Sequence, residues 1–187
     1  PKPYSKFREK DDNDFNFNKM YFIVSDKDDK TAKGLYNDIV KVRCDIKNIP
    51  SEYIDVNSKE MFKATLLRIE KNVIENQEIP FLHFECHGSP NGILLKSTGR
   101  LNWDIFAYFL TKINIACKNN LFVSMASCYG GYLILPLIEK VTGGKESRAP
   151  FFGYIGPVNE IKVGQLENGF GKFFDVLLDT LNMDEAI

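Results

Sequence analysis

The chain has 187 residues and a formal net charge of −1, and 44% of its residues are hydrophobic and 13% aromatic. This length allows one domain to bury a sizeable core, and the aromatic content excludes an intrinsically disordered chain, which is typically poor in aromatics and highly charged. Because 24 Lys and Arg residues balance 25 Asp and Glu residues, and because no apolar run approaches the roughly 20 residues that span a bilayer, neither nucleic acid nor a membrane is an expected partner.

The sequence divides into an arm and a domain. Residues 1–19 mix charges, Asn and isolated Phe without a strand or helix period, so we expect an N-terminal arm or linker there and a folded domain over 20–187. Strands are expected at 20–24, 53–56, 79–86, 121–126 and 150–158. Helices are expected at 31–44, after Ser58, at 102–117, at 133–141 and at about 165–181. This alternation predicts an α/β fold with a mostly parallel sheet.

Local signals indicate how the helices begin and which faces they bury. The pair Ser25 and Asp26 can end the first strand and cap the next helix, and Ser58 and Asn102 are expected N-caps. Three apolar stripes indicate buried faces. They comprise Met61, Thr65, Leu66, Ile69 and Val73; then Ile105, Phe106, Phe109, Leu110 and Ile113; then Phe170, Phe173, Phe174, Leu177, Leu178 and Leu181.

The four cysteines, at positions 44, 86, 117 and 128, form no C-x-x-C pair and are too few for a disulfide-stapled secreted domain. We therefore expect free thiols in a reducing compartment, and hence a cytoplasmic protein.

Two predicted loops contain residues suited to nucleophilic catalysis. The third strand ends in His87 and the fourth is followed by Cys128. If these strands are parallel neighbours, both ends emerge at the same edge of the sheet, where ligands and catalytic groups collect. A free thiol has a pKa of about 8.5 and needs a base to become the reactive thiolate, which an imidazole provides.

Glycines accompany both residues. Gly88 follows the histidine, and Gly130 and Gly131 lie just after the cysteine, where we expect them to allow the sharp turn that presents it. The backbone N–H groups of Gly88 and Cys128 are then candidates for an oxyanion hole.

The segments FLHFECHG at 81–88 and LFVSMASCYGG at 121–131 resemble the arrangement shared by caspase-like (clan CD) cysteine peptidases, closest to the CHAT and separase-like branch. The resemblance implies a caspase-like three-layer fold with helices on both faces of the sheet. It also implies a cysteine endopeptidase with His87 as base and Cys128 as nucleophile, without a cofactor. Such an enzyme is expected to cleave a protein substrate at few sites, as part of a bacterial defence or regulatory system. A protein partner that regulates the enzyme is also expected.

The sequence departs from the caspase pattern. The caspase signature is Q-A-C-[RQG]-G with the histidine about 50 residues upstream, whereas here Ala126 replaces the Gln and the histidine is 41 residues upstream. We therefore expect no caspase-type preference for Asp. In the CHAT and separase-like branch the loop after the last core strand lines the substrate pocket, which makes Asn159 and Glu160 candidates for binding a basic or polar side chain.

Two other interpretations remain open. The domain could be a catalytically inactive caspase-like interaction or scaffold module, or a flavodoxin-like binding domain in which the Cys and His are incidental. A zinc site is disfavoured, because His83 and His87 would lie about 13 Å apart on a strand. We expect no metal ligands, a structural role for His83, and a Cys86 side chain that points away from His87.

Overall fold

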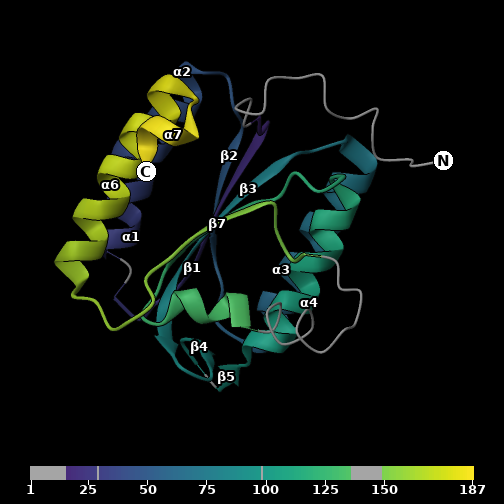
Figure 1. Ribbon diagram of the computed structural model, residues 1–187, viewed down its shortest axis with the longest axis vertical. Coiled ribbons are helices and arrows are strands. Elements are labelled where there is room, and N and C mark those ends of the chain that lie inside the picture. Colours follow the sequence, from purple (N-terminus) through teal and green to yellow (C-terminus); the bar gives the residue numbers. More distant parts are fainter. Residues whose placement is uncertain (1–15, 29, 98, 136–148) are drawn as a thin grey trace.

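The computed structural model describes residues 16–28, 30–97, 99–135 and 149–187. Its centre is a parallel sheet in the order β2-β1-β3-β6-β7 (Figure 1). The strands are β1 (Lys19–Ser25), β2 (Ser51–Asp55), β3 (Pro80–Ser89), β6 (Phe122–Ala126) and β7 (Gly153–Ile155). The predicted α/β class with a mostly parallel sheet is therefore confirmed.

Helices cover both faces of this sheet and complete three layers (Figure 1). One face is covered by α1 (Lys30–Gly34), the π-helical segment η1 (Leu35–Val40), α2 (Lys41–Ile46), α6 (Val163–Thr180) and α7 (Met183–Ala186). The other face is covered by α3 (Lys59–Asn76) and α4 (Trp103–Ala116). Among the described helices, none combines the length and the apolar character needed to cross a bilayer.

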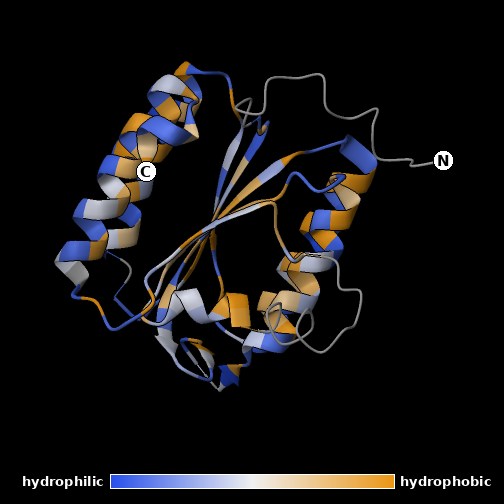
Figure 2. Cartoon of the chain, in the orientation of Figure 1, coloured by the Kyte–Doolittle hydropathy of each residue, from blue (hydrophilic) through white to orange (hydrophobic). Residues whose placement is uncertain are grey.

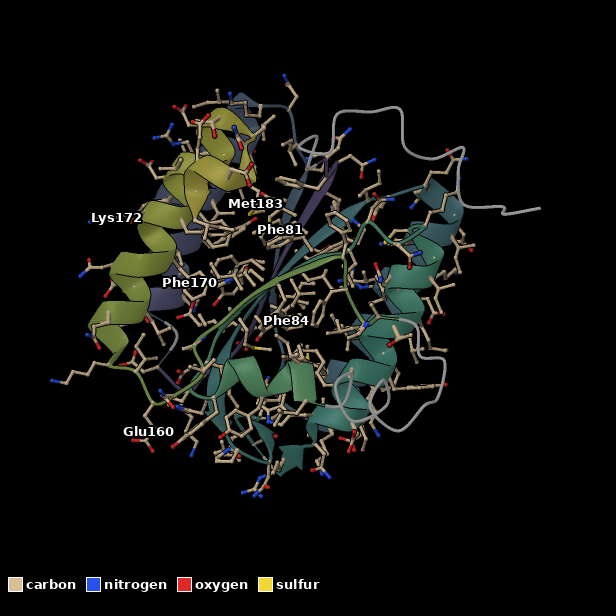
Figure 3. The ribbon with its side chains drawn as sticks, viewed as in Figure 1. Phe81, Phe84, Glu160, Phe170, Lys172 and Met183 are labelled. Atoms are coloured by element: carbon tan, nitrogen blue, oxygen red, sulfur yellow. The ribbon has the colours of Figure 1, made fainter. Side chains whose placement is uncertain are left out.

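The alternation of side chains along β3 divides the core in two. Phe81 belongs to the cluster beneath α6, and Phe84 belongs to the cluster beneath α3 and α4 (Figure 3). Hydrophobic colour accordingly follows the central strands and the inner helix faces (Figure 2). By the same alternation Glu85 and His87 face the α6 side, while Cys86 joins the α3–α4 core, as predicted.

Phe174 lies at the centre of the aromatic packing under α6. It is fully buried, and its ring centroid is 5.9 Å from that of Phe81 and 6.4 Å from that of Phe22. We expect Phe174→Ala to lower the free energy of unfolding by about 3–5 kcal/mol, because both apolar contact and filled volume are lost. Urea unfolding measures this change. Lys172→Ala, on the outward face of the same helix (Figure 3), should change stability by less than about 0.5 kcal/mol.

The helices predicted at 31–44, after Ser58, at 102–117 and at about 165–181 were correct in position, but some of the residues expected on their buried faces were wrong. The Ser58 hydroxyl accepts a hydrogen bond from the backbone N–H of Met61 and so caps α3 as expected. However, Met61 is exposed and Phe62 is buried in its place, and Ile105 of α4 is also exposed. Asn102 makes no side-chain capping bond. Where two apolar residues are adjacent, the sequence does not show which of them belongs to the buried face of the helix. Packing against the sheet decides this.

Strand β3 is longer than predicted. Strand β3 continues to Ser89 and forms an antiparallel hairpin with β4 (Gly92–Leu94), which in turn pairs with β5 (Arg100–Leu101). The last strand, β7, is shorter than the predicted 150–158. These segments are only two or three residues long, below the length at which periodicity is readable.

Two predictions concern residues outside the described part of the chain. The predicted helix 133–141 overlaps a short 3₁₀ helix, η2 (Gly130–Ile134), and its remainder from 136 onward lies outside the described residues. The predicted arm also lies outside them over 1–15. Phe17, within that predicted arm, is buried against Phe81, so the packed unit includes it.

Candidate active site

His87 lies on β3, and Cys128 follows the end of β6, the parallel neighbour of β3. Strands β3 and β6 are parallel, and their last paired residues are Glu85 and Ala126. Each candidate residue follows two positions later, at the carboxyl edge of the sheet. The parallel pairing expected from the sequence is therefore present, and it brings both residues to the same edge of the sheet.

Strands β3 and β6 stop pairing at this point, and Gly88 lies in close contact with the chain that follows β6. From His87 onward β3 pairs with β4, while β6 ends. A Cβ on Gly88 would overlap the carbonyl oxygen of Cys128 and the hydroxyl of Ser127. The backbone at Gly88 thus packs directly on the Cys128 peptide, and only a residue without a side chain allows this approach. The oxyanion-hole role of Gly88 and Cys128 stays a prediction.

His87 and Cys128 line one small pocket between the sheet edge and α6. It encloses about 70 Å³, far less than the roughly 300–1,000 Å³ of sites that hold drug-sized ligands or cofactors. The pocket therefore fits the end of one side chain. Its other lining residues are Asp26, Thr31, Leu35, Glu85, Cys86, Ala126, Ile161, Leu166, Glu167 and Phe170. The charged side chains among them are carboxylates.

Asp26 is a member of the site that sequence reasoning missed. Its Oδ1 lies 3.5 Å from Nε2 of His87, whose side chain is 67% exposed. The sequence predicted a helix cap for Ser25 and Asp26, but Ser25 instead donates to the carbonyl of Val56 and accepts from the N–H of Lys96. Asp26 is the first residue after β1, and its position at a carboxyl strand end was the signal that could have identified it.

Three of the four cysteines are buried. Burial raises the pKa of Cys44 and of Cys86 to about 12, and it also raises the pKa of Cys117. All four lie in the described residues, and Cys128 alone is not buried. Its Sγ lies 3.7 Å from the carbonyl oxygen of Ile161. Reactivity follows thiolate access, so Cys128 is the candidate nucleophile of the four.

The turn after Cys128 is built differently from the prediction. Its left-handed residue is Tyr129, with φ of 56°, and neither glycine that follows has a positive φ. The glycines instead allow close packing, since a Cβ would lie 2.7 Å from Met125 Cγ at Gly130 and 2.7 Å from Val158 Cγ1 at Gly131. The sharp turn is thus fixed by packing on both sides.

The loop containing Asn159 and Glu160 lies against this turn. The Asn159 carbonyl accepts from the N–H of Tyr129, and Glu160 accepts from the Tyr129 hydroxyl at 3.1 Å. Both residues are exposed, and Glu160 lies at the outer surface (Figure 3). In this conformation the neighbouring Ile161 lines the pocket. Substrate binding by Asn159 and Glu160 stays a prediction.

Glu85 is a second carboxylate in the lining of the pocket. Its side chain is 18% exposed, Thr31 donates to its Oε1 at 3.5 Å, and its Oε2 lies 3.8 Å from Nε2 of His83. Within the described residues, Oε2 is buried and has no hydrogen-bond partner. Oε2 thus faces the imidazole of His83, and Glu85 adds a carboxylate to the lining of the pocket.

His83 does not neutralise this carboxylate. It is fully buried, its Nδ1 lies 2.7 Å from the Ser124 hydroxyl, and rings of Phe22 and Phe174 pack on it at 4.4 and 5.0 Å. Burial lowers the pKa of His83, and the neighbouring Glu85 opposes this shift less strongly. Because the ordinary value is already about 6.5, the imidazole is uncharged at neutral pH.

The described residues contain no group of three or more His, Cys, Asp or Glu side chains placed to hold a metal ion. A scan against protein-family models and searches of curated proteins and of solved structures each returned no match.

Proposed function

We propose that this protein is a cysteine endopeptidase of caspase-like type, in which Cys128 is the nucleophile and His87 the general base. The observation that carries the proposal is that His87 and Cys128 line the same pocket at the carboxyl edge of the sheet. The accessibility of Cys128, in contrast to the three buried thiols, supports it. The free thiols and the absence of an apolar spanning helix among the described residues are compatible with action in the cytoplasm.

The proposed reaction proceeds by acyl transfer. His87 takes the proton of the Cys128 thiol as Sγ bonds to the peptide carbonyl carbon, and the backbone N–H groups of Gly88 and Cys128 donate to the oxyanion. His87 then protonates the leaving amine as the C–N bond breaks. Water, deprotonated by His87, attacks the thioester and releases the acid and the thiol. Asp26 orients the His87 ring and stabilises its protonated form.

The pocket favours substrates with a lysine or arginine before the scissile bond. Asp26, Glu85 and Glu167 line it, and among the described lining residues there is no lysine or arginine. A cationic side chain gains charge-assisted hydrogen bonds there, whereas an acidic one meets like charge. We thus assign to Glu85 the selective role that the resemblance implied for Asn159 and Glu160.

Peptide-library profiling by mass spectrometry tests the proposal. Wild type is expected to cut after Lys and Arg, and Cys128→Ala is expected to cut nothing. Glu85→Gln keeps the shape of the side chain and removes its charge, so the preference for Arg over Gln before the bond should fall about tenfold. Glu160→Gln is the matched variant on the neighbouring loop. If it changes the preference instead, the selective carboxylate is Glu160.

A further inference from the structure

A second pocket lies on the other side of His87 and has the opposite charge. It is a hollow more open to solvent than the first pocket, with a volume of about 630 Å³. Its described lining is Ser25, Lys27, His87, Leu94, Leu95, Lys96, Ser97, Gly99 and Arg100. The charged side chains among these residues, His87 aside, are three cations and no carboxylate. Among the described residues, His87 alone lines both pockets, so the proposed base lies between an acidic pocket and a basic pocket.

Two of these cations are available to a ligand. Lys96 is held by Asp55, with Nζ 2.6 Å from Oδ1, and its side chain is only 16% exposed. Lys27 and Arg100 are exposed. A further cation lies nearby, because a Cβ on Gly99 would be 3.3 Å from Nζ of Lys59. Asp26 and Lys27 are consecutive, yet they line the acidic and the basic pocket respectively.

The wall of this basic pocket is fixed in place. The N–H of Lys96 donates to the Ser25 hydroxyl at 3.1 Å, and the N–H of Ser97 donates to the Asn57 carbonyl at 3.1 Å. The loop after β4 is thereby tied to the ends of β1 and β2. A site formed before the ligand arrives loses less entropy on binding, so even solvent-exposed cations can discriminate between ligands.

The roles proposed for Cys128 and His87 indicate which part of a bound substrate lies in each pocket. Cys128 keeps the acyl half of the cleaved peptide, and His87 delivers a proton to the amine half. The acidic pocket touches both residues, whereas the basic pocket touches His87 and not Cys128. The acidic pocket therefore belongs to the residue before the scissile bond, and the basic pocket belongs to residues after it.

We propose that the basic pocket binds an aspartate or glutamate one or two residues after the scissile bond, so that the preferred substrate reverses charge at the cleavage point. This inference rests on the proposed peptidase function. Lys27 and Arg100 are specificity-determining residues in it. They contact the amine half of the substrate and take no part in bond making.

Hydrolysis rates of four matched peptides test this inference. All four have Arg immediately before the bond. Three of them carry Glu, Gln or Lys two residues after the bond, and the fourth carries Glu two residues before it. Glu after the bond should raise kcat/KM about three- to tenfold over Gln at low salt, and the advantage should shrink as salt rises. In Arg100→Glu the order of Glu and Lys peptides should reverse.

The control variant is Lys118→Glu, which makes the same charge change beyond the end of α4, at the amino end of β6. It should keep the wild-type order of the peptides. Equal rates for Glu, Gln and Lys, or an advantage for Glu only before the bond, would overturn the basic-pocket assignment while leaving the peptidase intact. Absence of any hydrolysis, together with no labelling of Cys128 by an arginyl chloromethyl ketone, would overturn the proposed function and this inference with it.

Discussion

Cys128→Ala is expected to reduce peptide hydrolysis by a factor of about 10⁴ or more, since the nucleophile is lost. His87→Ala should cause a similar loss, because the thiol then lacks its base and the leaving amine lacks its acid. The two residues act as a unit, so the double variant should be no slower than the slower single variant. Initial rates on a peptide with Arg before the bond measure all three.

The same experiment separates catalysis from folding. Cys117→Ala removes a buried thiol at the end of α4, far along the sheet from the pocket, and should retain hydrolysis. Mass mapping after arginyl chloromethyl ketone treatment should find the label on Cys128 and not on the buried cysteines. If wild type neither cleaves nor takes up the label, the interaction-module interpretation replaces the enzyme.

Gly88→Ala is expected to lower kcat by about 10²-fold or more, with little change in KM. The added Cβ would overlap the Cys128 carbonyl oxygen and the Ser127 hydroxyl, so the two strand ends must move apart. Displacement by about 1 Å misaligns the nucleophile with its base, and loss of one oxyanion donor costs about 10²–10³ in rate. Overpacking should also lower the free energy of unfolding by about 1–3 kcal/mol.

Gly169→Ala is the matched control for this substitution. A Cβ there meets nothing within 4 Å, and the position is an exposed turn of α6, so alanine should stabilise the helix by up to about 1 kcal/mol. Thermal unfolding and hydrolysis of both variants give the comparison. A Gly88→Ala variant with wild-type kcat would contradict the close approach of Gly88 to Cys128 and the role of its N–H.

Much of the fold was readable from local patterns. The strands at β1, β3 and β6 are nearly continuous apolar runs, which is how strands buried on both faces appear. The stripe Phe170, Phe173 and Phe174 correctly placed one face of α6 on the sheet. The hairpin β4–β5 escaped prediction because its strands are too short to show a period.

The candidate site was partly readable for the same reason. His87 and Cys128 follow apolar runs and are close to glycines in the sequence, so their positions alone identified them as candidate catalytic residues. Asp26 and Glu85 gave no such signal. Asp26 looked like a helix cap, and Glu85 was one polar residue within a buried strand, although its carboxylate opens onto the pocket.

The sequence by itself determined the alternation of strands and helices, the two strand ends that carry His87 and Cys128, and the reading of the cysteines as thiols rather than a disulfide scaffold. Only the tertiary structure decided what surrounds them. The net charge of the whole chain is close to zero, yet the folded protein has an acidic pocket and a basic pocket that both include His87. The physical reason is that composition sums charges over the chain, whereas a ligand responds to those within a few ångströms, and folding alone brings Asp26, Glu85 and Glu167 together.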